Sequence, residues 1–298
     1  MIMRRLKILL FIGKITTLIL FTFFHPAWAN DPLKVMVSIV PQKYFVEKIG
    51  GEFVHVSVMV PPGFNPATYE PKPQQMVALV KSEIYFAIGV PFEKIWLEKF
   101  AGVNPGMRIV HTEDGIDKLP MVAHPQHNDE ELGHHVTKDP HIWLSPPLVQ
   151  IQLRNILEAL LRMDPEREEQ YLSNYNTFTR EVTAIDHRIR EIFSGKGEGG
   201  QFMVYHPSWG YFAQAYGLKQ IPVEVEGKEP KASDLQKLIQ HARKEKVKAI
   251  FLQPQFSAKS AHTIAKAIGC RVMYADPLAV NWVENLLKVA EEFMSSLE

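Results

Sequence analysis

Short apolar runs alternate with amphipathic stretches along most of the chain. Residues 34–40, 54–60 and 84–88 are rich in β-branched and aromatic side chains and are predicted to be strands. Residues 42–49 and 74–81, which follow strand segments, repeat apolar positions at helical spacing. Strands separated by helices of about ten residues indicate parallel βαβ units. The same alternation resumes after residue 200 and continues to a last predicted helix at the end of the chain.

The longest amphipathic tract lies in the middle of the chain. We predict one helix over residues 146–163 and a second after Asp164-Pro165, a pair typical of a helix start. Apolar residues keep helical spacing up to residue 193, where a glycine-rich segment ends the pattern. A helix of about 28 residues would be about 42 Å long. Because this length exceeds a small domain, we interpret the helix as a connection between two lobes.

The expected fold is therefore α/β, with two similar lobes of (βα) repeats, parallel sheets and a long rigid connecting helix. We place the N-terminal lobe at residues 30–165, the linker helix at 166–195 and the C-terminal lobe at 196–298. Within the first lobe, the polar residues 112–138 are predicted to form a histidine-rich loop, since a stretch this long without periodicity is usually functional or disordered.

Residues 1–29 have the pattern of an export signal. Arg4, Arg5 and Lys7 precede an apolar run, and Ala27-Trp28-Ala29 is a small-x-small cleavage site. The apolar run is too short for a convincing transmembrane helix. We expect cleavage after Ala29 and a periplasmic location, with an uncleaved anchor as the alternative.

Composition narrows the class of protein further. The full chain has equal numbers of basic and acidic side chains, 33 of each, and cleavage would remove four basic ones and no acidic one. Residues 30–298 would therefore carry a net charge of −4, and a mildly acidic protein has no electrostatic basis for binding nucleic acid. Cys270 is the only cysteine, so no internal disulfide can form. With 46% hydrophobic residues, the chain can bury a large core without one.

Three ligand-type residues stand near proline or aromatic residues, close to the ends of apolar runs. They are His141, His206 and Asp276, and their spacing along the chain is nearly even. Ligands of open parallel sheets bind beyond the carboxyl ends of the strands. Imidazole nitrogen and carboxylate oxygen both suit zinc. A lone histidine is usually a surface or structural residue, but three such residues after successive βα units favour a shared metal ion.

Other polar residues could assist such a site. Asp139 is placed to orient an imidazole without binding the metal itself. The loop carries His124, His127, His134 and His135 close together along the chain. Two interpretations of these histidines stay open: a mobile surface loop, or a segment that collects metal ions.

Several motifs together resemble one family. They are Tyr-Glu-Pro-Lys-Pro at 69–73, Asp-Pro-His-Ile-Trp-Leu at 139–144, the segment 206–218 that begins His-Pro-Ser-Trp-Gly-Tyr, and Tyr-Ala-Asp-Pro-Leu at 274–278, with 224–230 and 253–255 in addition. In this order they resemble the periplasmic solute-binding proteins of zinc and manganese ABC transporters. The likeness covers essentially all of the chain after the export signal.

The resemblance implies two lobes linked by a rigid helix, with a metal ion held in the cleft by four protein ligands. His141, His206 and Asp276 match three of those positions, whereas the position of the first histidine holds Ala67. Zinc with three protein ligands keeps an open position, usually filled by water. Water, Glu70 or a loop histidine could therefore be the fourth ligand. A histidine at 206, rather than a carboxylate, favours zinc over manganese.

The resemblance thus predicts a binding protein without catalytic activity, expected to be monomeric, that captures Zn²⁺ and delivers it to an ABC transporter permease. Binding of manganese or another transition metal is the first alternative. A zinc-dependent hydrolase, with Glu70 as the general base, is the second. A protein for another solute, or a surface adhesin, is the third.

Overall fold

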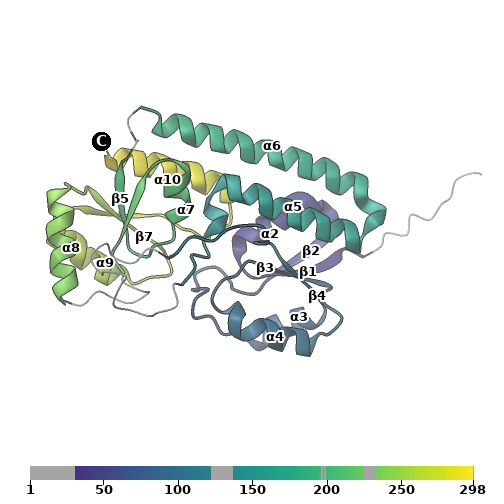
Figure 1. The fold of residues 1–298 in the computed structure, drawn as a ribbon. Coiled ribbons are helices and arrows are strands. Elements are labelled where there is room, and N and C mark those ends of the chain that lie inside the picture. Colours follow the sequence, from purple (N-terminus) through teal and green to yellow (C-terminus); the bar gives the residue numbers. More distant parts are fainter. Residues whose placement is uncertain (1–30, 122–136, 196, 198, 225–231, 298) are drawn as a thin grey trace, which may run out of the picture. The chain divides into compact units, whose positions relative to one another are not determined.

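The computed structural model describes residues 31–121, 137–195, 197, 199–224 and 232–297. They form two parallel four-stranded sheets with helices between the strands (Figure 1). The predicted α/β fold with two similar lobes is therefore confirmed, while the residue boundaries assigned to the lobes stay a prediction. No helix in these ranges is long and apolar enough to cross a membrane.

The N-terminal lobe is built on a sheet with the strand order β2-β1-β3-β4, in which all neighbours are parallel. Strand β3 is buried along its whole length, as expected for a central strand covered on both faces. The elements of this lobe are β1 (Leu33–Val37), α2 (Val40–Gly50), η1 (Gly51–Phe53), β2 (Val54–Val58), α3 (Pro73–Val80), β3 (Ile84–Ala87), α4 (Glu93–Val103) and β4 (Arg108–His111).

The C-terminal lobe repeats this topology. Its sheet has the order β6-β5-β7-β8, again with parallel neighbours only. Strand β7 occupies the place of β3 and is likewise buried throughout. The elements are β5 (Gln201–Val204), α7 (Gly210–Ala215), β6 (Lys219–Pro222), α8 (Ala232–Lys244), β7 (Ala249–Leu252), α9 (Ala258–Ile268), β8 (Arg271–Tyr274) and α10 (Trp282–Leu297).

Each sheet contains a topological switch point. In each sheet the first strand has the second strand on one side and the third on the other. The order in which strands are added therefore reverses between β1 and β3 and between β5 and β7. Ligands of such sheets bind in the crevice beyond the carboxyl ends of these two strands. Residues after β3 in one lobe, and after β5 and β7 in the other, are therefore the expected walls of a site.

The first strand is shorter than its apolar run predicts. We expected a strand over residues 34–40, but β1 ends at Val37 and α2 begins at Val40. The side chain of Gln42 explains the early turn, because its Oε1 accepts hydrogen bonds from the backbone N–H groups of Ser38 (3.1 Å) and Ile39 (3.2 Å). These contacts satisfy donors that would otherwise be left free at the helix start.

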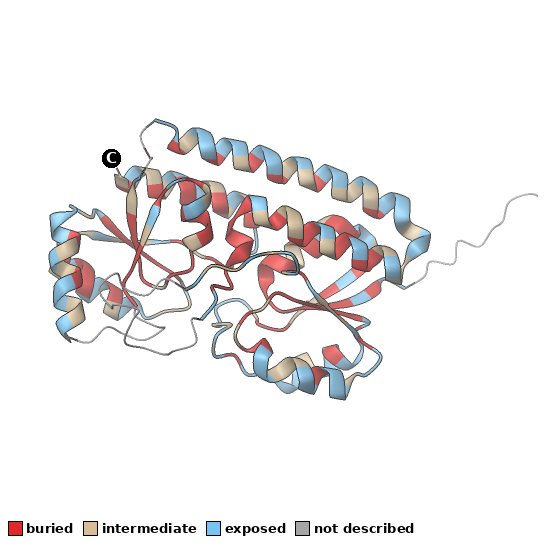
Figure 2. Ribbon diagram, viewed as in Figure 1, coloured by how far each residue is buried: buried red, intermediate tan, exposed pale blue. Residues whose placement is uncertain are grey.

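Two long helices form the middle of the chain, as predicted, and the structure shows that they run antiparallel. Helix α5 (Pro146–Met163) is followed by a 3₁₀ turn (Pro165–Arg167) and by the 26-residue helix α6 (Glu168–Phe193). Helix α6 packs on α5 and α2 and also on α10 of the C-terminal lobe, and Figure 1 shows it running beside all three. Its buried and exposed residues alternate along its length (Figure 2). The helix thus packs against both lobes.

A pair of buried tryptophans joins the lobes next to their shared core. The Trp143 indole N–H donates to the carbonyl of Pro277 (2.7 Å), and the Trp282 indole N–H donates to the carbonyl of Trp143 (2.7 Å). Trp143 lies in the 3₁₀ turn η2 (Ile142–Leu144), whereas Trp282 begins α10. One apolar cluster includes residues of both sheets, from Val35 to Phe251. Such packing disfavours a hinge between the lobes.

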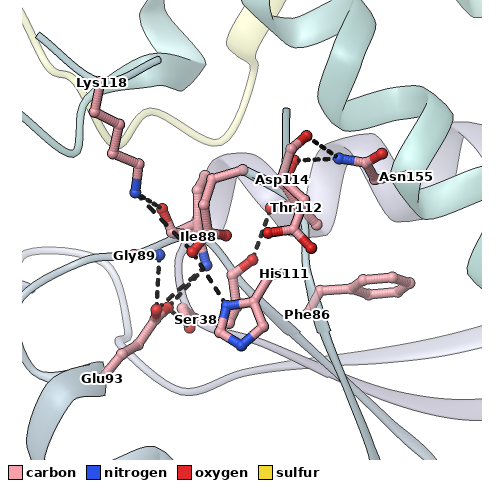
Figure 3. A network of polar contacts seen from close by, with 12 residues as sticks. Ser38, Phe86, Ile88, Gly89, Glu93, His111, Thr112, Asp114, Lys118 and Asn155 are labelled. Atoms are coloured by element: carbon pink, nitrogen blue, oxygen red, sulfur yellow. Dashed lines mark hydrogen bonds and ion pairs between the residues drawn. The ribbon is translucent and has the colours of Figure 1, made fainter. Parts of the chain in front are cut away.

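Glu93 is a buried carboxyl at the switch point of the N-terminal sheet. It accepts hydrogen bonds from the Ser38 hydroxyl (2.5 Å) and from the backbone N–H groups of Ile88 (3.0 Å) and Gly89 (2.7 Å). Figure 3 shows the carboxyl facing the turn after β3, with Lys118 bonded to the Ile88 carbonyl on the other side. Burial raises the pKa of Glu93 from 4.5 to about 7. The carboxyl therefore holds the turn that leads to Val90 and Pro91.

This raised pKa predicts a pH-dependent contribution to stability. Between pH 4.5 and about 7 the folded state binds more protons at Glu93 than the unfolded state, so the free energy of unfolding falls as the pH rises. The fall is on the order of 3 kcal/mol. In Glu93→Gln this part of the pH dependence should vanish, as urea unfolding at several pH values can measure. Glu98→Gln, an exposed position on the same helix, should keep the wild-type profile; parallel profiles for all three proteins would contradict the assignment.

Candidate metal centre

His141 is oriented by the carboxylate two residues before it. Asp139 is buried, and its Oδ1 accepts hydrogen bonds from the His141 ring Nδ1 (2.7 Å) and the His141 backbone N–H (2.9 Å). The backbone of Asp139 is fixed in turn, since its carbonyl accepts from the Tyr211 hydroxyl (2.9 Å) and its N–H donates to the Leu119 carbonyl (2.8 Å). This is the arrangement predicted for Asp139, although its effect on a metal ion stays a prediction.

His206 follows β5 at the switch point of the C-terminal sheet and is held on three sides. Its ring Nδ1 lies 2.6 Å from Oε2 of the buried Glu224. Gln253 accepts from the His206 backbone N–H (3.1 Å) and donates to its carbonyl (2.7 Å). The ring stacks on Phe256, with centroids 4.8 Å apart. The sequence places the histidine at the end of a buried strand, and these contacts then orient its ring.

Burial lowers the pKa of His206 below its ordinary value of 6.5, against the opposing effect of the hydrogen bond with Glu224. A lower pKa keeps the imidazole neutral at neutral pH, and the neutral form is the one that binds metal ions. The lowered pKa therefore reduces competition between protons and a metal ion at this residue near neutral pH.

The two imidazoles lie next to each other, edge to face, although they are far apart along the chain. Their ring centroids are 5.3 Å apart, at an interplanar angle of 73°. On each ring Nδ1 donates to a carboxylate, so Nε2 is the nitrogen left to bind a metal. A carboxylate on the far nitrogen of a metal-binding imidazole fixes its tautomer and raises its basicity. The pair can therefore supply two of the four ligands of a zinc ion.

Both imidazoles line one small pocket. Its volume is about 60 Å³, far below the several hundred Å³ of pockets for organic ligands. A metal ion with a water molecule fits such a volume, whereas a metabolite does not. The wall contains both imidazoles, together with Ala67, Val90, Gln255 and Phe256.

Asp276 lies beside this pocket rather than in its wall. The next two residues, Pro277 and Leu278, line the pocket, while Asp276 does not. Its Oδ1 accepts hydrogen bonds from the Leu278 N–H (2.9 Å) and the Gln255 amide (3.1 Å), which leaves Oδ2 as the oxygen to bind a metal. Across the described residues, no three His, Cys, Asp or Glu side chains are grouped closely enough to hold a metal ion. The structure thus brings the two histidines together, and Asp276 as the third ligand stays a prediction.

The other predicted auxiliary residues are placed as follows. Glu70 is exposed and does not line the pocket, so the structure gives it no contact with the imidazoles. The loop histidines His124, His127, His134 and His135 lie outside the described residues. Ala67 lines the pocket, on the side of the N-terminal lobe.

Sequence reasoning missed four residues that shape this site. Glu224, Gln253, Gln255 and Phe256 orient His206 or Asp276, or form the pocket wall. A signal for three of them was present, because residues 253–256 directly follow the buried strand β7 at the switch point. Glu224 follows the edge strand β6 and had no comparable signal beyond its family-like segment.

Comparison with known proteins finds relatives whose names describe zinc uptake or zinc binding. The high-affinity zinc uptake system protein ZnuA of Bacillus subtilis is 29% identical over 270 residues, which are 88% of this chain and 82% of the relative. The zinc-binding lipoprotein AdcA of Streptococcus pneumoniae is 24% identical, and the chain spans 59% of its length.

Solved structures show the same relationship. A crystal structure of ZnuA is 42% identical, with a TM-score of 0.83 over 90% of this chain and 100% of that one. A zinc-bound ZnuA deletion mutant has a TM-score of 0.82 and the same identity, over 90% of this chain and 99% of that one. Residues 35–296 match the family described as "Zinc-uptake complex component A periplasmic". The chain therefore belongs to the ZnuA family of zinc-uptake solute-binding proteins.

Proposed function

We propose that this protein is exported, captures Zn²⁺ in the pocket between His141 and His206, and delivers it to an ABC transporter permease. The observation that carries the proposal is the adjacent pair of imidazoles, each with Nδ1 bonded to a buried carboxylate. Neutral imidazoles with a free Nε2 suit zinc, and manganese prefers a site richer in oxygen. Asp276 is the proposed third ligand, through Oδ2.

Charge around the pocket supports capture of a cation. Three carboxylates, Asp139, Glu224 and Asp276, contact the imidazoles or adjoin the pocket wall. A divalent cation offsets most of this charge, because two of the three negative charges are compensated. The small volume of the pocket matches a metal ion with a water molecule, which supports binding of an ion as the function.

The proposal is tested by metal titration and by location of the bound ion. Metal-free protein should bind one Zn²⁺ per chain in a calorimetric titration, and Mn²⁺ much more weakly. An anomalous difference map at the zinc edge should then place the ion within bonding distance of both histidines. Tighter binding of Mn²⁺, or a zinc ion far from both rings, would favour one of the alternatives instead.

Ala67→His is expected to tighten zinc binding. Ala67 lines the same pocket as both imidazoles, so a histidine at this position adds a third nitrogen ligand from the wall. Affinities of the variant and wild type can be compared by competition with a zinc chelator. Thr68→His, at the exposed neighbour that does not line the pocket, is the matched control. Equal affinity for Ala67→His and wild type would mean that residue 67 cannot reach the ion.

A further inference from the structure

The side-chain amide of Gln255 has a fixed orientation. Its Nε2 donates to Asp276 Oδ1 (3.1 Å), and a carboxylate can only accept, so the amino side of the amide faces Asp276. The amide oxygen then faces away from that carboxylate. Gln255 also lines the pocket with His141, His206 and Ala67. One side chain thus connects the predicted third ligand with the wall of the pocket.

The oxygen of this amide is buried and accepts no hydrogen bond from any described residue. A buried carbonyl oxygen without a donor destabilises a structure unless something else supplies the hydrogen. The two imidazoles cannot supply it, since each donates its Nδ1 hydrogen to a carboxylate and offers Nε2 as a metal-binding nitrogen. The position therefore suits a donor that arrives with the cargo.

Zinc brings such a donor. With His141, His206 and Asp276 as ligands, a four-coordinate zinc ion keeps one position for water. The methyl group of Ala67, also in the wall, offers no ligand atom for that position. A zinc-bound water is polarised and is a stronger hydrogen-bond donor than free water, so it pairs well with a neutral carbonyl oxygen.

We propose that Gln255 completes the zinc site from outside the coordination sphere: its Oε1 accepts a hydrogen bond from the water bound to zinc, while its Nε2 holds Asp276. This inference rests on the proposed function, because it needs zinc in the pocket. Gln255 is a positioning residue for one protein ligand and for the water. It replaces, by way of water, the protein ligand that Ala67 does not provide.

A crystal structure of the zinc-loaded protein tests the contact directly. We expect a water molecule about 2.0–2.2 Å from zinc and within about 3.2 Å of Gln255 Oε1. A fourth protein ligand in that position, or a bound water turned away from Gln255, would overturn the inference. Zinc at the two histidines in either case keeps the proposed function intact, so the two failures are distinguishable.

Binding measurements then separate the two roles of the amide. Gln255→Leu should weaken zinc binding by about 10–100-fold, the usual effect of losing a group that supports a metal ligand. In the Ala67→His background an imidazole takes the place of the water, so the same replacement should cost a clearly smaller factor. An equal loss of zinc affinity in both backgrounds would mean that Gln255 acts through Asp276 alone. Unchanged affinity in Gln255→Leu would show that Gln255 supports neither Asp276 nor the bound water. Gln240→Leu, an exposed glutamine on α8, is the control and should leave affinity unchanged.

Discussion

The double variant His141→Ala, His206→Ala should lose measurable zinc binding, and each single variant should bind more than about 100-fold more weakly. Loss of a supporting group alone weakens a metal site by about 10–100-fold, and these residues are the proposed ligands themselves. The two rings are the only imidazoles that the described part of the chain places in the pocket. Calorimetric titration of metal-free protein measures the effect.

Exposed histidines elsewhere in the chain supply the controls. His187 on α6 and His262 on α9 lie outside the pocket wall, and alanine at either position should leave zinc affinity unchanged. Circular dichroism and the unfolding midpoint verify that the variants fold. If the double variant retained wild-type affinity, zinc would have to bind elsewhere, with the loop histidines at 124–135 as the first place to look.

Trp282→Ala should lower the free energy of unfolding by about 3–5 kcal/mol, the usual cost of removing a large buried aromatic side chain. Trp282 is 1% exposed and packs edge-on against Phe45 of α2, with centroids 5.2 Å apart. Its indole N–H also donates to the Trp143 carbonyl. The variant would open a cavity and leave that carbonyl without its donor. Urea unfolding measures the loss.

Trp96→Ala serves as the matched control, since Trp96 on α4 is only partly buried and should cost clearly less. Trp282→Ala should also weaken zinc binding, because the pair of tryptophans holds Pro277, the neighbour of Asp276. If both variants lost the same stability, the contacts of Trp282 between the lobes would contribute no more than those of a partly buried tryptophan.

Local pattern predicted the secondary structure closely. The apolar pattern predicts strands over residues 249–252 and 271–274 and a helix over residues 258–268, and β7, β8 and α9 have these bounds. Their ends carry strong local signals, such as Gly269 after α9, which adopts the left-handed conformation that favours glycine. The predicted first strand was too long, because a side chain, Gln42, turns the backbone where the apolar run continues. The periodicity of apolar residues cannot show such a contact.

The candidate ligands were predictable for a similar reason. His206 follows a buried strand in a βα repeat, and the carboxyl ends of the central strands are where such sheets bind ligands. His141 was predicted from its place beside a proline and near an aromatic residue, and the structure places its ring 5.3 Å from that of His206. Residue type, strand end and motif are all properties of short segments, so the sequence carries them directly.

Only the tertiary structure decided what surrounds those ligands. The partner of His206 is Glu224, from the end of a neighbouring strand, and the partner of Asp276 is Gln255, from the loop after another. The raised pKa of Glu93 likewise follows from its burial between two strand ends. The sequence by itself determined the strands, helices and ligand types, because these depend on neighbours along the chain. Orientation, burial and the place of Ala67 in the pocket wall depend on segments that meet only when both sheets are folded.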